Sequence, residues 1–248
     1  MEQTASKVFP RVSWLGLDGL LVSFTDRLNE PANRAALALR DAIERESWPG
    51  VEETAASLVS TYLRFDAAAM DGDALRARLA ALVDSRDWTR ADLPGGRRRW
   101  TVPAVFGTEL APQLQEAAAL AGVTPEKAIA QIAATPLRVQ TIGFAPGQPY
   151  LGELADHWSI PRQTQLTPRV PVGALCAAIR QMTLFSVTTP TGWRHVAQTA
   201  LRLFRPDGET PFLMRPGDEV RFLPIDRGAY ERLSNEGPDG GAVAEPIR

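Results

Sequence analysis

The residues best suited to chemistry lie in one loop, residues 143–150, with the sequence GFAPGQPY. Pro146 and Pro149 restrict the backbone of this loop, while Gly143 and Gly147 leave their amide groups uncovered by side chains. Such amides can bind a carboxylate or stabilise an oxyanion. A rigid connection between two strands explains the same pattern without any ligand, so the loop by itself leaves both interpretations open.

Three further side chains extend this candidate site. Arg162 follows Pro161 and offers a forked donor for a carboxylate or a phosphate, although an arginine near a turn is often only a surface residue. The aromatic residues Tyr150 and Trp193 could form the wall of a groove or seal a core. The sequence therefore favours a small-molecule site in the second half of the chain.

Other catalytic signatures are missing from the sequence. It contains no phosphate-binding Walker loop, no dinucleotide fingerprint and no cysteine or histidine pair at metal-ligand spacing. His157 and His195 are far apart in the chain, and Cys176 lies in an apolar, strand-like run that predicts a buried, inert thiol. No metal and no motif-bound cofactor is expected, and no nucleophile, acid or base can be named.

Composition limits the possible partners. The 248 residues are 44% hydrophobic and carry a formal net charge of −2, which gives no general attraction to nucleic acid or to an anionic membrane. No run approaches the roughly 20 apolar residues of a membrane helix, and the N-terminal residues MEQTASKVF do not resemble a secretory leader. We expect a cytoplasmic protein that binds neither nucleic acid nor membrane.

Two domains must position these residues. Residues 1–90 show the order strand, helix (31–45), strands and helix (from about 71), which suits a small ferredoxin-like α+β domain. Residues 91–99, with Pro94, two glycines and three arginines, are predicted to be a linker. A strand, two helices and many short strands with turn signals then predict a barrel or sandwich over 100–230, and 231–248 are predicted to be a flexible tail.

A family resemblance adds to this interpretation. The pattern GF-x-PG-x-x-YLG-x-L, present at residues 143–154, together with Pro161-Arg162, VPVG (170–173), PTGW (190–193) and PGD (216–218), resembles the carboxyltransferase / allophanate hydrolase subunit 1 family. That family includes the B subunit of the prokaryotic 5-oxoprolinase and a Kip-type inhibitor of a histidine kinase. The resemblance implies a cyclophilin-like β-barrel after the ferredoxin-like domain.

The resemblance also implies a function. It predicts a hydrolase subunit that assembles with a homologous barrel protein, the C-type subunit, and with an A-type subunit. The complex would open 5-oxo-L-proline with ATP, which enters only through that complex. The substrate-binding residues that the resemblance suggests are Phe144, Pro146, Gly147, Gln148, Tyr150, Arg162, Gln181 and Trp193.

Several positions depart from the family pattern, mostly from polar or glycine residues to apolar or bulky ones. If they line the groove, they favour a less polar ligand, because each fully buried apolar side chain contributes about 1.5–3 kcal/mol. The groove-lining candidates are Ile132, Leu137, Ile179, Phe185 and Gln198. Two alternatives to the hydrolase subunit therefore remain: a standalone cyclase or isomerase with an apolar groove, and a non-catalytic inhibitor of a histidine kinase.

Overall fold

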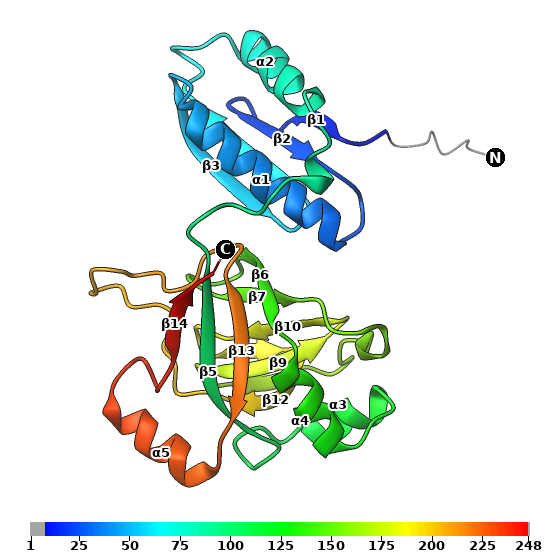
Figure 1. Cartoon of the computed structure of the whole chain (residues 1–248), viewed down its shortest axis with the longest axis vertical. Helices are drawn as coiled ribbons and strands as arrows, with labels where there is room; N and C mark the ends of the chain where they lie inside the picture. The colour runs from blue at the N-terminus through cyan, green and yellow to red at the C-terminus, as the bar shows by residue number, and fades with distance from the viewer. Residues whose placement is uncertain (1–7, 248) are drawn as a thin grey trace, which may run out of the picture. The chain divides into compact units, whose positions relative to one another are not determined.

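The computed structural model describes residues 8–247 and divides the chain into two compact units, Met1–Gly95 and Gly96–Arg248 (Figure 1). Each unit has its own hydrophobic core, and the two cores share no residue. Among the described residues, no helix is long and apolar enough to cross a membrane.

The first unit pairs two β-hairpins with two helices. Its strands are β1 (Arg11–Trp14), β2 (Gly19–Ser23), β3 (Val51–Ser57) and β4 (Ser60–Phe65), in the sheet order β1-β2-β4-β3 with every pair antiparallel. The helices are α1 (Glu30–Glu46) and α2 (Gly72–Asp84), followed by a 3₁₀ turn at Trp88–Arg90. Asn29 caps α1 by accepting a hydrogen bond from the Ala32 amide, and Pro31 lies in the first turn, as the sequence predicts.

The ferredoxin-like prediction for this unit is not confirmed. A ferredoxin-like unit has the order βαββαβ, whereas the described part of this unit runs ββαββα, with a strand added at its start and none after α2. The added strand, β1, has only four residues and is exposed or half-buried throughout. Such a short strand lacks the apolar run by which a strand is found in a sequence.

The second unit is built on a closed β-barrel. Its elements are β5 (Arg98–Phe106), α3 (Leu114–Leu120), α4 (Pro125–Ala134), β6 (Leu137–Ile142), β7 (Pro149–Gly152), a 3₁₀ turn (Asp156–Trp158), β8 (Thr167–Val170), β9 (Ala174–Ala178), β10 (Gln181–Leu184), β11 (Thr189–Thr191), β12 (Arg194–Gln198), β13 (Glu219–Pro224), α5 (Arg227–Glu236) and β14 (Val243–Pro246). Within the described residues, seven strands follow one another in the order β12-β9-β10-β7-β6-β13-β5, and β5 pairs back with β12 to close the barrel.

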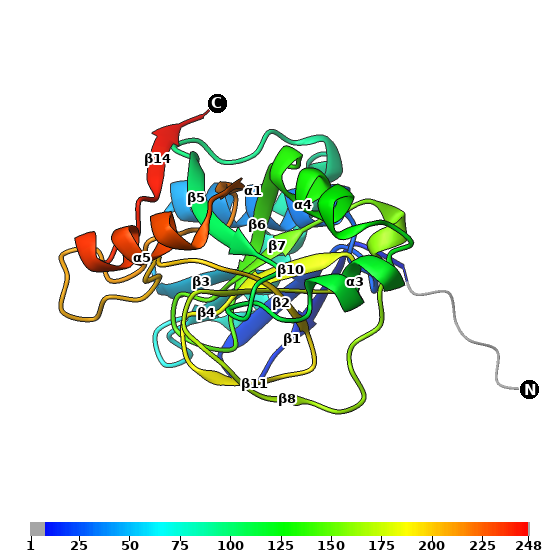
Figure 2. The same ribbon diagram turned by 90° about the horizontal axis from the view of Figure 1, so that it is seen from below.

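Successive side chains along each strand point alternately into the barrel and toward its outer face. Leu175 and Ala177 of β9 belong to the barrel core. Cys176, between them, belongs to a second apolar cluster with Phe185 and Trp193, because successive side chains of a strand point to opposite faces. The short sheet of β8 and β11 is labelled in Figure 2. Its residue Val170 belongs to that outer cluster.

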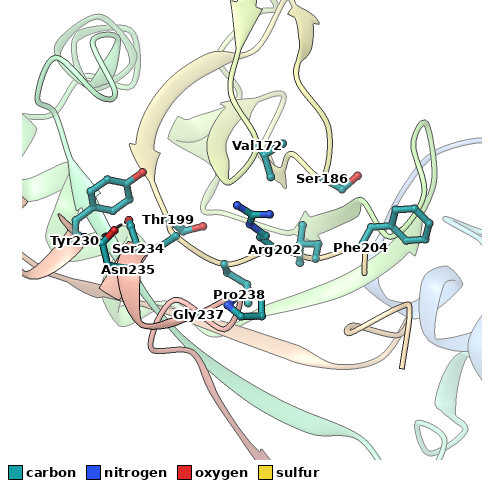
Figure 3. A pocket seen from close by; sticks show the side chains of 13 residues that line it. Val172, Ser186, Thr199, Arg202, Phe204, Tyr230, Ser234, Asn235, Gly237 and Pro238 are labelled. Carbon is teal, nitrogen blue, oxygen red and sulfur yellow. Dashed lines mark hydrogen bonds between the residues drawn. The ribbon is translucent and has the colours of Figure 1, made fainter. Parts of the chain in front are cut away.

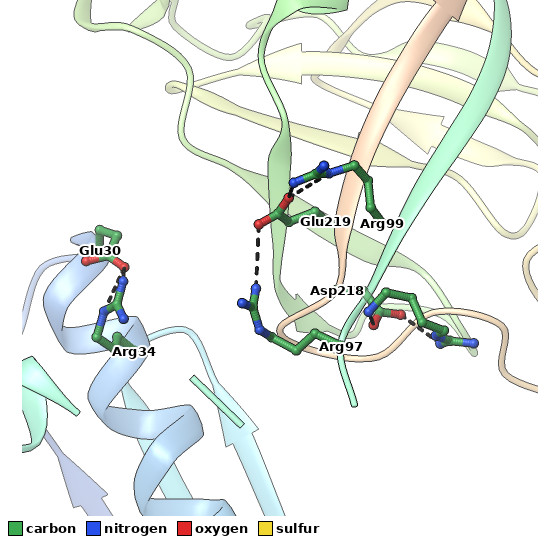
Figure 4. Close-up of polar contacts among 7 residues, drawn as sticks. Glu30, Arg34, Arg97, Arg99, Asp218 and Glu219 are labelled. Atoms are coloured by element: carbon green, nitrogen blue, oxygen red, sulfur yellow. Dashed lines mark hydrogen bonds and ion pairs between the residues drawn. The ribbon is translucent and has the colours of Figure 1, made fainter. Parts of the chain in front are cut away.

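The arginine-rich segment is part of the barrel, not of a linker. Arg98 and Arg99 are the first residues of β5. The buried Asp218 carboxylate pairs with the Arg98 guanidinium at 2.7 Å and also accepts a hydrogen bond from the Trp100 indole at 3.2 Å. Glu219 pairs with Arg99 at 2.8 Å (Figure 4). The predicted linker 91–99 is wrong at its C-terminal end, because acidic partners about 120 residues away in the chain hold these arginines.

The predicted flexible tail, 231–248, is also wrong for most of its length. Residues up to Glu236 continue α5, and β14 pairs antiparallel with β5, with Val243 opposite Thr101. The gain in backbone hydrogen bonds along an exposed strand edge outweighs the polar composition that suggested disorder.

Candidate functional site

The loop at residues 143–150 connects β6 to β7 as a tight turn. The Gly143 amide donates to the Gln148 carbonyl at 3.0 Å, and the Gln148 amide donates to the Ala145 carbonyl at 3.1 Å. The Gly143 amide is therefore engaged by a backbone carbonyl inside the loop and is not free to bind an anion in this structure. Phe144 has a φ of +71° and is 71% exposed, so the turn presents an aromatic ring to solvent.

Beyond its tip, the loop packs closely on the rest of the barrel. Gly147 has a φ of +69°, and a Cβ there would lie 3.3 Å from the Leu203 carbonyl oxygen and 3.5 Å from the Phe204 Cβ. Gln148 is 1% exposed, and its Oε1 has no hydrogen-bond partner within the described structure. The Pro149 carbonyl accepts from the Thr183 hydroxyl at 3.1 Å. Pro146, in contrast, is exposed.

Tyr150, Trp193 and Arg162 come together on the outer face of the barrel. The Tyr150 and Trp193 rings meet edge to face, with centroids 5.8 Å apart. The Gln163 amide donates to the Gly192 carbonyl at 2.7 Å, which holds the exposed Arg162 beside Trp193. Burial raises the pKa of Tyr150, while the Gln148 side chain and the Arg162 charge act against that rise. The arrangement offers a neutral phenol, an indole and a guanidinium to one ligand.

Gln181 belongs to a buried polar pair beside these residues. Its Nε2 donates to Gln140 Oε1 at 2.7 Å, and both side chains are nearly inaccessible. Gly152 makes room for this pair, because a Cβ at that position would lie 2.5 Å from Gln140 Oε1. The bond with Gln140 gives Gln181 a structural role in the outer face.

Two of the five predicted groove-lining residues do not lie in a groove. Ile132 and Leu137 are 0% exposed and belong to the barrel core, so their prediction as groove residues is wrong. Both face the interior because α4 and β6 place their apolar residues there, which explains their apolar character without any ligand.

The other three predicted groove-lining residues, Ile179, Phe185 and Gln198, lie in three different places on the barrel unit. Ile179 and Arg180, with φ of 47° and 64°, form the two-residue turn between β9 and β10, and Ile179 is 47% exposed at its tip. Phe185 packs in the outer apolar cluster. The Gln198 Nε2 donates to the Val172 carbonyl at 2.8 Å and the Thr199 carbonyl at 3.0 Å, and its Oε1 has no partner among the described residues.

Sequence reasoning missed that Cys176 and His195 face each other across two strands. They are direct neighbours in the β9–β12 register and are 0% and 4% exposed. Burial raises the pKa of the Cys176 thiol and lowers the pKa of His195, so both are neutral near pH 7. Only the long-range pairing of β9 with β12 reveals this pair, and no short motif signals it. Among residues 8–247, no group of three or more His, Cys, Asp or Glu residues could hold a metal ion.

A closed barrel that carries arginine and aromatic side chains on its outer face, preceded by a smaller α+β unit, defines a two-unit protein with a candidate binding site on its barrel. Residues 10–214 match the family described as "Carboxyltransferase domain, subdomain C and D", and the chain belongs to that family. This confirms the resemblance seen in the motifs.

Relatives of known name or structure agree with this family. The chain is 29% identical to the B subunit of 5-oxoprolinase from Bacillus subtilis (strain 168) over 243 residues, covering 91% of this chain and 98% of that protein. The crystal structure of TTHA0988 superposes with a TM-score of 0.70 at 31% identity, covering 84% of this chain but only 40% of that one. The urea carboxylase of Kluyveromyces lactis shares the fold, with a TM-score of 0.74 at 16% identity over 95% of this chain and 24% of that one.

Proposed function

We propose that the protein is a B-type subunit of a 5-oxoprolinase-like complex, which opens the cyclic amide of 5-oxo-L-proline with ATP. The observation that carries this proposal is the likeness to the 5-oxoprolinase B subunit over 98% of the length of that protein. A likeness over the whole length supports a shared role in an assembly more strongly than a shared fold does.

The cluster of Arg162, Tyr150 and Trp193 is the part of this chain that we propose contacts the substrate. A guanidinium can bind the substrate carboxylate in a bidentate manner. The Tyr150 hydroxyl, whose pKa burial raises above its ordinary value, can donate to an amide carbonyl. The indole of Trp193 can pack against the small ring. The other proposed binding residues shape or support the loop and sheet around this cluster. They are Phe144, Pro146, Gly147, Gln148 and Gln181.

The complex must supply the rest of the chemistry. This sequence has no phosphate-binding loop, so in the proposal ATP is bound by one of the partner proteins. A barrel protein homologous to the C-type subunit and a protein of the A-type are the expected partners. The exposed Phe144 ring is a candidate contact for one of them, because large exposed aromatic side chains are common at interfaces.

The test is reconstitution with both partner proteins. We expect ATP hydrolysis that depends on 5-oxo-L-proline, and we expect Arg162→Ala to lower kcat/KM by about tenfold or more, the usual effect of losing a charged hydrogen bond. The matched control is Arg221→Ala, because Arg221 is an exposed arginine of β13 away from the cluster. Native mass spectrometry of the same samples reports whether the complex forms.

The outcomes separate the three candidate functions. A stable complex without turnover would favour the kinase-inhibitor alternative, in which this chain only binds protein. A lone protein that turns over a hydrophobic compound without partners would favour the standalone enzyme. That last alternative is weakened by the structure, since Ile132 and Leu137 fill the barrel core and line no groove.

A further inference from the structure

A cavity of about 740 Å³ opens beside the barrel, and none of Arg162, Tyr150 and Trp193 lines it. One wall is the segment 199–204 that follows β12, and the opposite wall is α5 with the turn after it (Figure 3). Val172 and Ser186 complete the lining. The volume lies within the range of about 300–1,000 Å³ that is usual for small-molecule sites.

The wall contributed by the C-terminal segment is firmly seated. The Arg202 amide donates to the Pro238 carbonyl at 2.9 Å, and the Arg205 guanidinium bridges to Asp239 at 2.7 Å. Gly240, with a φ of +53°, lies so close to Ala200 that a Cβ would be 2.5 Å from its carbonyl carbon. These contacts make the cavity a preformed site, which lowers the entropy cost of binding.

Among the described residues that line the cavity, Arg202 is the only charged one. Its guanidinium lies between Val172 and Ser186 on one side and Thr199, Ser234 and Tyr230 on the other (Figure 3). Within residues 8–247, Arg202 has no acidic partner for this group. An arginine that no carboxylate neutralises gives the cavity a positive potential, and its fork matches the geometry of an anion.

A buried hydroxyl strengthens the case for a ligand. Ser186 is 8% exposed, and its Oγ has no hydrogen-bond partner in the described structure. Buried polar groups are nearly always paired, because an unpaired one costs about 1–3 kcal/mol. The Thr199 hydroxyl already donates to the Gly173 carbonyl, and the Ser234 hydroxyl donates to the Tyr230 carbonyl. Ser186 is therefore the buried lining hydroxyl of the described structure that is left to bind a ligand atom.

The remaining lining mixes polar and apolar side chains. Its apolar surface comes from the exposed Val172 and Pro238 and from the half-buried Phe204, whose ring stacks on Phe212 with centroids 5.3 Å apart. A single cation beside such a surface fits a monoanion with an apolar body. A phosphate ester, which carries nearly two charges, would be expected to meet more than one cation.

We propose that this cavity binds a small carboxylic acid with an apolar body, with Arg202 holding the carboxylate, Ser186 donating to it, and Val172, Phe204 and Pro238 contacting the apolar part. This site is separate from the Arg162 cluster and does not depend on the proposed hydrolase function.

The test is calorimetric binding to the full-length protein with four probes: 3-phenylpropionate, its neutral amide 3-phenylpropanamide, acetate and phenyl phosphate. We expect 3-phenylpropionate to bind and the amide to bind about tenfold more weakly, the loss expected for one charge-assisted hydrogen-bond pair. Acetate should bind more weakly still, because it lacks the apolar body.

Variants locate the binding. Arg202→Gln should weaken 3-phenylpropionate about tenfold, and Ser186→Ala should weaken it by a smaller factor, while Arg221→Gln should have no effect. Thermal unfolding of each variant confirms that it is folded. Equal binding of the acid and the amide, no effect of Arg202→Gln, or no binding of 3-phenylpropionate at all would overturn the proposal. Tighter binding of phenyl phosphate would overturn the assignment to carboxylates.

Discussion

Among individual residues, the buried His195 should make the stability of the barrel unit depend on pH. It is 4% exposed, and burial lowers its pKa below the ordinary value of about 6.5. The unfolded chain therefore binds a proton at higher pH than the folded chain does, so the stabilising effect is complete above about pH 6.5. We expect the free energy of unfolding to fall as the pH drops from about 6.5 toward the lower pKa of the folded protein.

This expectation can be tested with one variant and one control. Chemical unfolding at several pH values between about 7 and 5 should show a smaller pH dependence for His195→Asn than for the unchanged protein. His157→Asn is the control, because His157 is the other histidine of the sequence and is exposed. An unchanged slope for His195→Asn would contradict the assignment to His195.

Cys176 and His195 show which features of the site could be predicted from the sequence and which could not. The apolar run around Cys176 correctly predicted a buried thiol, because a continuous apolar run that is buried on both faces of a strand is a local signal. That His195 lies beside it depends on the register of β9 with β12, which no local pattern encodes. The prediction that Ile132 and Leu137 line a groove is wrong for a related reason. A departure from a family motif indicates that the surroundings of the side chain differ, but it does not indicate whether that side chain faces the core or a ligand.

At the scale of elements, the C-terminal segment 237–241 contacts residues 199–202, and the composition of the sequence does not predict this contact. Gly240 and Gly241 suggested a flexible tail, but both have positive φ values in a turn that leads β14 back to β5. At Gly240 the glycine is required because the backbone approaches Ala200 too closely for a side chain. Helix α1, by contrast, was predictable from its cap, its proline and its period, which are all local signals.

Gly240→Ala should therefore weaken the seating of α5 and β14. A Cβ there would lie 2.5 Å from the Ala200 carbonyl carbon and would occupy a left-handed backbone conformation. We expect a loss of about 2–4 kcal/mol in the free energy of unfolding. Gly95→Ala is the matched control, since a Cβ at Gly95 meets nothing within 4 Å. Equal urea midpoints for the two variants would show that the segment is not seated as described.

Across the whole chain, two separate cores imply two units that fold independently. The core of the first unit draws its buried residues from Leu20 to Trp88, and the barrel core draws its own from Trp100 to Phe222. The boundary at Gly95–Gly96 lies between them. Since each unit buries its own apolar surface, the hydrophobic contribution to stability should be retained when the chain is divided there.

We therefore expect fragments 1–95 and 96–248 each to unfold in a single cooperative transition when produced separately. Circular dichroism during urea unfolding measures this, and the full chain provides the reference. The larger fragment should be the more cooperative, because the slope of unfolding grows with the surface that is exposed. A barrel fragment that unfolds without cooperativity would mean that its stability depends on the first unit. In the reconstituted complex, the same fragment would then be unable to act alone as the substrate-binding part.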